Sequence, residues 1–177
     1  MTHDSIPCIT ILTTDQMQDW LDDNLTGRGE RHFRRLVGFW QDVENGLRVI
    51  WAAWRKNQDG SQTMIGQITV QHQSFYPPFG KNGIFEIVDL WVHPSARQNG
   101  VGKGLLQAAI NYAQQHQCPA IGLGVGVTHD FGAAQRLYTA NGFMPDGTGL
   151  WSQGHQAEEG ETITLQDGVI MMWVKKL

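Results

Sequence analysis

The chain has 177 residues, 41% hydrophobic and 17% charged, which is long enough for one well-buried core and too short for two ordinary domains. We therefore expect a single domain over residues 1–177. A formal net charge of −4 and a pI near 5.9 exclude an overall electrostatic attraction to nucleic acid or to an anionic membrane, and favour a cationic partner.

The sequence lacks the signals of export, membrane insertion and structural metal binding. Its N-terminus has no basic region followed by an apolar core, and no apolar run approaches the roughly 20 residues that span a bilayer. Cys8 and Cys118 lie far apart and form no C-x-x-C pair, so neither a disulfide framework nor a zinc site is indicated. These features predict a cytoplasmic protein without a metal.

The first half of the chain predicts helices and a hairpin. In chain order we expect a strand at 9–12, a helix at 15–25, a second helix at 30–43 and paired strands at 47–54 and 63–71. In the second helix the apolar residues recur at three- and four-residue steps, as at Phe33, Leu36 and Trp40, which is the helical period. The turn residues of 57–61 lie between the two strands and predict the hairpin.

Residues 74–80 form an aromatic loop. Two prolines in this segment exclude regular structure, yet it carries Phe75, Tyr76 and Phe79. Such a loop either fills the core or lines a pocket, and the sequence leaves both roles open.

The second half of the chain alternates strands and helices. We expect a strand at 84–93, a helix at 100–116, a strand at 120–127, a helix at 133–140, an irregular loop to 160, and a terminal hairpin of 163–165 with 169–174. Strand, helix, strand, helix implies a partly parallel sheet, so we predict an α/β (α+β) fold.

Three glycines, Gly100, Gly102 and Gly104, fall where a strand gives way to a helix. Backbone N–H groups there can approach a phosphate, and the helix dipole adds a favourable field. The Walker pattern fails, because it needs glycine at Arg97 and a hydroxyl residue at Gly104. The dinucleotide fingerprint also lacks its third small residue.

The segment Arg97-Gln98-Asn99-Gly100-Val101-Gly102 instead resembles the acetyl-CoA motif of the GNAT superfamily of N-acetyltransferases. That motif reads Arg or Gln, two residues, Gly, one residue, Gly or Ala. Leu90-Trp91-Val92-His93-Pro94 is similar to the family's strand before the motif, and Ala134-Gln135-Arg136-Leu137-Tyr138 with Gly142-Phe143 is similar to its A-x-x-L-Y block. The resemblance implies a mixed, partly parallel central sheet flanked by helices on both faces.

By resemblance, the co-substrate is acetyl-CoA and no metal takes part. The residues implied in binding it are Leu90, Trp91, Val92, Arg97, Gln98, Asn99, Gly100, Val101, Gly102, Lys103 and Ala134. One position departs from the family, which often has an Asn three residues before the alanine, where this chain has Phe131. We assign no role to that position.

Acetylation of an amine needs a proton acceptor. An alkylamine is charged at pH 7, and freeing its lone pair costs about 4.6 kcal/mol. Glu86 is the leading candidate base, because it lies on the presumed cofactor strand where some family members have a catalytic glutamate. Regular alternation would place Asp89 on the other side of that strand. His93 and His129 are weaker alternatives.

Tyr138 is the candidate acid. By resemblance it protonates the departing sulfur, and a phenol suits this role because it is fully protonated at pH 7. Ala134 shares its helical face and is small enough to leave room for the cofactor arm.

The acceptor stays open among a small amine, an aminoglycoside-like substrate and a peptide amine. The residues expected to line its site are Phe75, Tyr76, Phe79, Asp89 and Trp151. A homodimer also stays open. The alternative function is a CoA-binding or acetyl-CoA-binding sensor without turnover, suggested by the missing Asn at Phe131.

Overall fold

The computed structural model describes residues 7–16, 20, 30–165 and 168–177, and of residues 30–36 the backbone alone. The chain divides into two compact units. Unit one comprises Met1–Gln71 and Asp89–Ala109, and unit two comprises His72–Val88 and Ile110–Leu177. The single-domain expectation stays a prediction.

The described residues form an eight-stranded mixed sheet with the order β1-β2-β3-β4-β5-β8-β6-β7. β4 (Phe85–Val92) pairs in parallel with β5 (Ala120–Gly126). The pairs β1–β2, β2–β3, β5–β8, β6–β7 and β6–β8 are antiparallel. The sheet is therefore partly parallel, as the alternation of strands and helices predicted.

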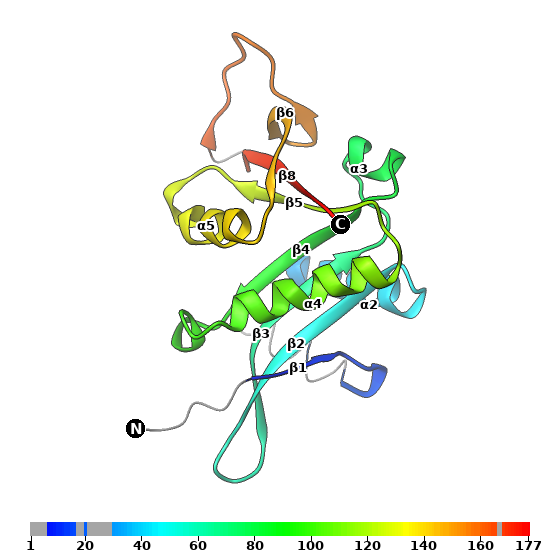
Figure 1. Ribbon diagram of the computed structural model, residues 1–177, viewed down its shortest axis with the longest axis vertical. Helices are drawn as coiled ribbons and strands as arrows, with labels where there is room; N and C mark the ends of the chain where they lie inside the picture. The colour runs from blue at the N-terminus through cyan, green and yellow to red at the C-terminus, as the bar shows by residue number, and fades with distance from the viewer. Residues whose placement is uncertain (1–6, 17–19, 21–29, 166–167) are drawn as a thin grey trace. The chain divides into compact units, whose positions relative to one another are not determined.

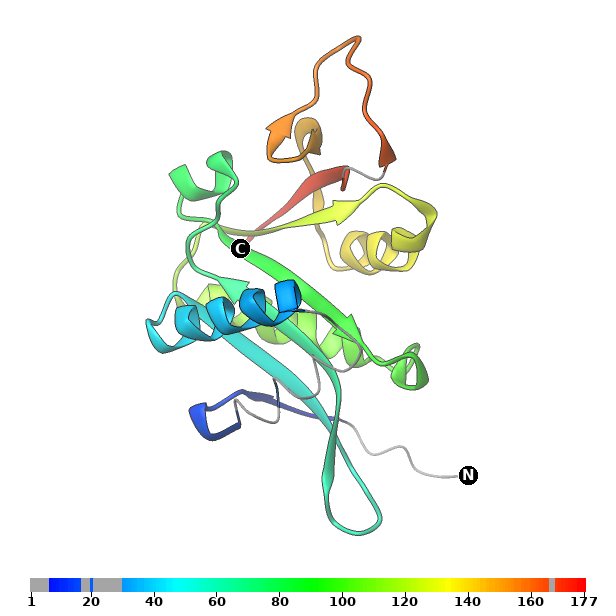
Figure 2. The same cartoon turned by 180° about the vertical axis from the view of Figure 1, so that it is seen from behind.

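Unit one holds the N-terminal strands and the helices that cover them. Its strands are β1 (Cys8–Ile11), β2 (Arg48–Lys56), β3 (Gln62–Gln71) and the second half of β4. Its helices are η1 (Thr14–Gln16), α2 (Glu30–Glu44), η2 (Pro94–Ala96) and the first part of α4 (Val101–Gln115). The two views show α2 and α4 on opposite faces of these strands (Figures 1 and 2).

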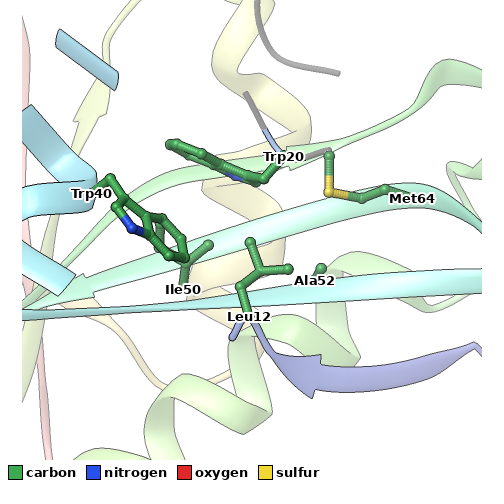
Figure 3. Close-up of a cluster of buried hydrophobic side chains, with 6 residues drawn as sticks. All are labelled: Leu12, Trp20, Trp40, Ile50, Ala52 and Met64. Atoms are coloured by element: carbon green, nitrogen blue, oxygen red, sulfur yellow. The ribbon is translucent and has the colours of Figure 1, made fainter. Parts of the chain in front are cut away.

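Apolar side chains from β2, β3 and α2 pack with Leu12, just after β1, and with Trp20 in a core cluster of unit one. The cluster contains Leu12, Trp20, Trp40, Ile50, Ala52 and Met64, all drawn in Figure 3. The Trp20 indole also donates a buried hydrogen bond of 2.8 Å to Gln67. Several of the seven tryptophans of the chain therefore serve packing.

Unit two holds the C-terminal elements. They are α3 (Pro77–Lys81), β5, η3 (His129–Phe131), α5 (Gly132–Ala140), β6 (Met144–Ser152), β7 (His155–Gln156) and β8 (Ile170–Lys176). β8 lies between β5 and β6 and pairs antiparallel with both. The core of this unit contains Tyr76, Phe79 and Met172.

Two of the predicted elements are wrong. The prolines of the aromatic loop do not exclude a helix, because Pro77 and Pro78 occupy the first turn of α3, where a missing N–H costs nothing. The predicted terminal hairpin is replaced by a β6–β7 hairpin, and the last strand pairs with β5 and β6. The first predicted helix, at 15–25, lies mostly outside the described residues.

Candidate functional site

The segment between β4 and α4, in unit one, has the shape of an anion-binding loop. Gln98 has a φ of 64° and Gly100 a φ of 78°, so two left-handed residues flank Asn99. Such alternation turns consecutive backbone N–H groups toward one side. Gly100 is the residue type that adopts this conformation without strain.

Within the described residues, the N–H groups of residues 98–103 make no backbone hydrogen bond, and the first helical bond runs from Gly104 N to Gly100 O at 2.9 Å. The first turn of a helix leaves such donors unsatisfied and concentrates its positive dipole end there. The loop therefore suits a phosphate.

Arg97 is fixed at the edge of this loop. Its Nε donates to the carbonyl of Val92 at 3.0 Å, and the side chain is exposed. Because a guanidinium has five donors, the remaining N–H groups stay available to an anion. Lys103 is also exposed, so two cationic side chains accompany the free amides.

The end of β4 lies beside β3. The N–H of His93 donates to Ile65 O at 2.9 Å, and a Cβ on Gly66 would come within 2.9 Å of the Trp91 carbonyl. Glycine at position 66 therefore allows this close approach. The Trp91 side chain is exposed to 36%, and Leu90 and Val92 are half-buried.

β4 is not a regular strand at Asp89. This residue has a φ of 53°, which is a left-handed conformation that breaks strict alternation of side chains. This irregularity interrupts the regular alternation that would place Asp89 and Glu86 on opposite sides of the strand. Asp89 is half-buried.

Glu86 lies in unit two, on the half of β4 that pairs with β5. Its Cα is in register with that of Gly122. A Cβ added to Gly122 would lie 2.1 Å from the ring of Phe79. Because register partners project to the same face of a sheet, the Glu86 side chain is on the face that Phe79 covers.

Ser74 orients the Glu86 carboxylate. The hydroxyl of this buried serine donates to Glu86 Oε2 at 2.5 Å and accepts from the backbone N–H of Tyr76 at 3.0 Å. This hydrogen bond fixes the position of one carboxylate oxygen of Glu86, which is half-buried.

Tyr76 and Trp151, both predicted acceptor residues, are in edge-to-face contact with ring centroids 4.8 Å apart. The Tyr76 hydroxyl lies 2.5 Å from Asp146 Oδ2 and 2.8 Å from Thr148 Oγ1. Burial, and then the neighbouring Asp146, raise the pKa of Tyr76 to about 12. A phenol has one proton and a carboxylate only accepts, so Tyr76 donates to Asp146.

The other two aromatic residues of the loop have different surroundings. Phe79 is exposed to only 2% and packs edge-on against Tyr76 at 4.7 Å, which gives it the core role that the sequence left open. Phe75 is exposed to 91% and remains available to a ligand or partner.

Tyr138 projects from α5 into a buried position. Its ring packs on Phe143, with centroids 5.9 Å apart, and its hydroxyl has no hydrogen-bond partner within the described residues. Burial raises the pKa of this phenol to about 12. Among the described residues, no acceptor holds the proton of Tyr138. Ala134, one turn earlier on α5, is half-buried.

Phe131, the departure from the family pattern, covers the end of β5. Its ring lies 2.3 Å from where a Cβ of Gly126 would be, so glycine there makes room for it. The Gly126 carbonyl accepts from Gln135 Nε2 at 2.9 Å. Phe131 is exposed to 44% and offers an apolar surface where an Asn would offer polar atoms.

Sequence reasoning missed Ser74, Asp146 and Thr148. The run Asp146-Gly147-Thr148-Gly149 was interpreted as an irregular loop because of its glycines. The polar residues of that run follow Gly142-Phe143 after only Met144 and Pro145. Their partner, Tyr76, is 70 positions earlier in the chain, which a local pattern does not reveal.

The described residues contain no group of three or more His, Cys, Asp or Glu side chains placed to hold a metal ion. None of the helices that the structure describes is both long and apolar enough to cross a membrane.

The sequence matches the family model described as "Acetyltransferase (GNAT) family" over residues 14–143. The chain belongs to the GNAT family of acetyltransferases. The match includes both sequence blocks, the one before α4 and the one in α5. A comparison with curated protein sequences gave no match.

Solved GNAT structures share this fold. An IAA acetyltransferase from Bacillus cereus is 17% identical with a TM-score of 0.63, over 97% of this chain and 99% of that one. Arabidopsis thaliana NAA60 in complex with acetyl-CoA is 18% identical with a TM-score of 0.67, over 97% and 98%. A spermidine N-acetyltransferase chimera from Vibrio cholerae and human sequences is 14% identical with a TM-score of 0.63, over 97% and 96%. At these identities the likeness establishes the fold.

Proposed function

We propose that this GNAT chain transfers the acetyl group of acetyl-CoA to an amine. The observation that carries the proposal is the row of unpaired amides at residues 98–103, at the N-terminus of a 15-residue helix. A phosphate-binding loop in a GNAT chain fits the pyrophosphate of acetyl-CoA. A similar structure, of NAA60, holds acetyl-CoA.

In this proposal the pyrophosphate is held by Arg97, Gln98, Asn99, Gly100, Val101, Gly102 and Lys103. Leu90, Trp91, Val92 and Ala134 contact the rest of the molecule. Acetyl-CoA supplies the activated acetyl carbon, and the residues of this chain orient the reactants and move protons.

Glu86 is proposed to take the proton of the amine. The amine must lose a proton to attack, at a cost of about 4.6 kcal/mol at pH 7. The carboxylate held by Ser74 at 2.5 Å accepts that proton directly or through an ordered water.

Tyr138 is proposed to return a proton to the departing sulfur. Burial keeps its hydroxyl protonated, with a pKa of about 12, and no described protein group competes for the proton. The acceptor is proposed to lie against Phe75, Tyr76 and Trp151, with Asp89 as a further contact. One of the similar structures is named a spermidine N-acetyltransferase, which is compatible with an amine acceptor.

The test is the variant Tyr138→Phe, assayed by thiol release from acetyl-CoA with an amine panel. We expect turnover to fall by more than about tenfold, because the donor is lost. Acetyl-CoA affinity should stay nearly unchanged. Tyr112→Phe is the control, since Tyr112 is another helical tyrosine whose pKa burial raises, although it is only partly buried, and the variant should keep turnover within about twofold. Equal turnover in Tyr138→Phe and the control removes Tyr138 from the mechanism.

The alternative of a CoA sensor is separated by the same assay. Sustained thiol release that depends on an amine, and that disappears in Gly100→Trp, rules out a sensor without turnover. Binding of acetyl-CoA with no release for any amine would instead favour the sensor, and would contradict the proposed transfer.

A further inference from the structure

Asp146 lies where β6 leaves the regular sheet. The pairing of β6 with β8 shifts register between Pro145 and Leu150, and Gly147 and Gly149 have φ values of 90° and 80°. Irregularities of this kind redirect side chains out of the ladder. Here they bring Asp146 and Thr148 to the hydroxyl of Tyr76.

The Asp146 carboxylate accepts three hydrogen bonds, all from neutral donors. Oδ2 accepts from the Tyr76 hydroxyl, and Oδ1 accepts from the backbone N–H and the hydroxyl of Thr148 at 2.9 and 2.8 Å. A carboxylate has about four lone-pair sites. One site therefore remains, and the negative charge is not neutralised by these contacts.

Asp146 also lacks a cationic partner. In the part of the chain that the structure describes, no lysine, arginine or histidine pairs with it, although it is half-buried. A fully buried carboxylate would need a cation of the protein as its partner. Asp146 is only half-buried, so its charge stays accessible to a cation that comes from outside the chain.

Two aromatic side chains, Tyr76 and Trp151, belong to the same cluster as this carboxylate. The Trp151 indole N–H donates to Thr148 Oγ1 at 2.9 Å, and its ring meets Tyr76 at 4.8 Å. Trp151 is only partly buried. Tryptophan is the ring that attracts an ammonium group most strongly, so charge and aromatic surface favour the same kind of ligand.

The same residue, Tyr76, connects this cluster to Glu86. Its hydroxyl binds Asp146, while its backbone N–H binds Ser74, which in turn binds Glu86. A reacting nitrogen near Glu86 must lose its proton, whereas a cation at Asp146 must keep its own. The two positions therefore suit two different groups of one acceptor.

We propose that Asp146, Tyr76 and Trp151 bind a second cationic group of the acceptor, so that the preferred acceptors are amines with an additional positive charge, such as α,ω-diamines. This inference rests on the proposed acetyl transfer. It adds a substrate class to that reaction.

The experiment compares diaminoalkanes of different lengths with alkylamines of the same length. Calorimetry in the presence of CoA measures binding, and thiol release from acetyl-CoA measures turnover. We expect the wild type to bind the best diamine about tenfold more tightly than its matched monoamine, as an ion pair together with a cation–π contact would give. In Asp146→Asn the diamine-to-monoamine ratio should fall toward one. Glu44→Gln removes an exposed charge elsewhere and should keep the ratio.

The outcomes separate the two proposals. If the wild type shows no preference for diamines, or if the preference persists in Asp146→Asn, then Asp146 does not bind a second cationic group of the acceptor. Either result overturns this inference even where turnover is observed. Diamine binding that depends on Asp146, without turnover of any amine, supports the proposed role of Asp146 in binding. The same result contradicts the proposed acetyl transfer. Where thermal unfolding reveals that Asp146→Asn is not folded, Trp151→Leu replaces it. The ratio should then fall about threefold, and an unchanged ratio overturns the proposal.

Discussion

Replacing Gly100 by alanine separates the conformation of the phosphate loop from its contacts. Gly100 has a φ of 78°, and a Cβ added to it would meet no atom within 4 Å. Steric clash therefore contributes nothing. The cost is the left-handed conformation itself, about 1–2 kcal/mol for a residue with a Cβ.

The conformational cost of the substitution can lower either the stability of the protein or its affinity for acetyl-CoA. If the loop keeps its shape, the free energy of unfolding falls by about 1–2 kcal/mol and acetyl-CoA affinity is unchanged. If Gly100→Ala relaxes its φ, stability is retained but the amides of residues 98–103 turn away, and affinity falls by about 5- to 30-fold. The two losses together should equal about 1–2 kcal/mol.

Urea unfolding of the free protein and calorimetric titration with acetyl-CoA measure the two losses separately. Gly100→Asn is the control, because asparagine tolerates the left-handed region better than alanine, and it should lose less in total. The reasoning is refuted if Gly100→Ala matches the wild type in both measurements, or if the asparagine variant loses as much as the alanine variant.

Two further predictions concern unit two. In Gly122→Ala the new methyl would lie 2.1 Å from the buried Phe79 ring, so we expect a loss of about 1–3 kcal/mol in the free energy of unfolding. In a double-mutant cycle, Phe79→Leu should recover part of that loss. Strictly additive losses would contradict the clash. Burial raises the pKa of Tyr138 to about 12, from about 10 in the unfolded chain. The contribution of this group to the free energy of unfolding is therefore complete below pH 10 and is lost as the pH rises through 12. The loss amounts to up to about 2.7 kcal/mol. The difference in unfolding free energy between wild type and Tyr138→Phe should change over that range, and a constant difference would count against a buried phenol.

The phosphate loop could be predicted because its signals are local. The spacing of Arg97, Gly100 and Gly102 fits a turn from a strand into a helix, and the structure has unpaired amides at this point. The left-handed φ of Asp89 was not predictable in the same way. Aspartate is only moderately suited to that conformation, and no glycine marks the irregularity.

The prediction of how the C-terminal strands pair was wrong for a different reason. Residues 144–152 carry two glycines and a proline, which locally favour a loop, yet they form β6 because β8 offers an open edge. Tertiary pairing outweighed local preference here. The same non-local cause hid the contact of Asp146 with Tyr76, since neither residue's neighbours in sequence indicate it.

The raised pKa of Tyr138 sets a condition on its proposed role. A phenol with a pKa of about 12 gives its proton to a thiolate with an ordinary pKa of about 8.5 only at a cost near 4.8 kcal/mol. Burial that disfavours the tyrosinate must therefore disfavour the departing sulfur anion as well, because desolvation penalises both charged forms. Tyr138 can act as the acid only if the sulfur leaves into surroundings as dry as its own. A substitution that admits water beside Tyr138 should then lower turnover even though it lowers the pKa of the phenol.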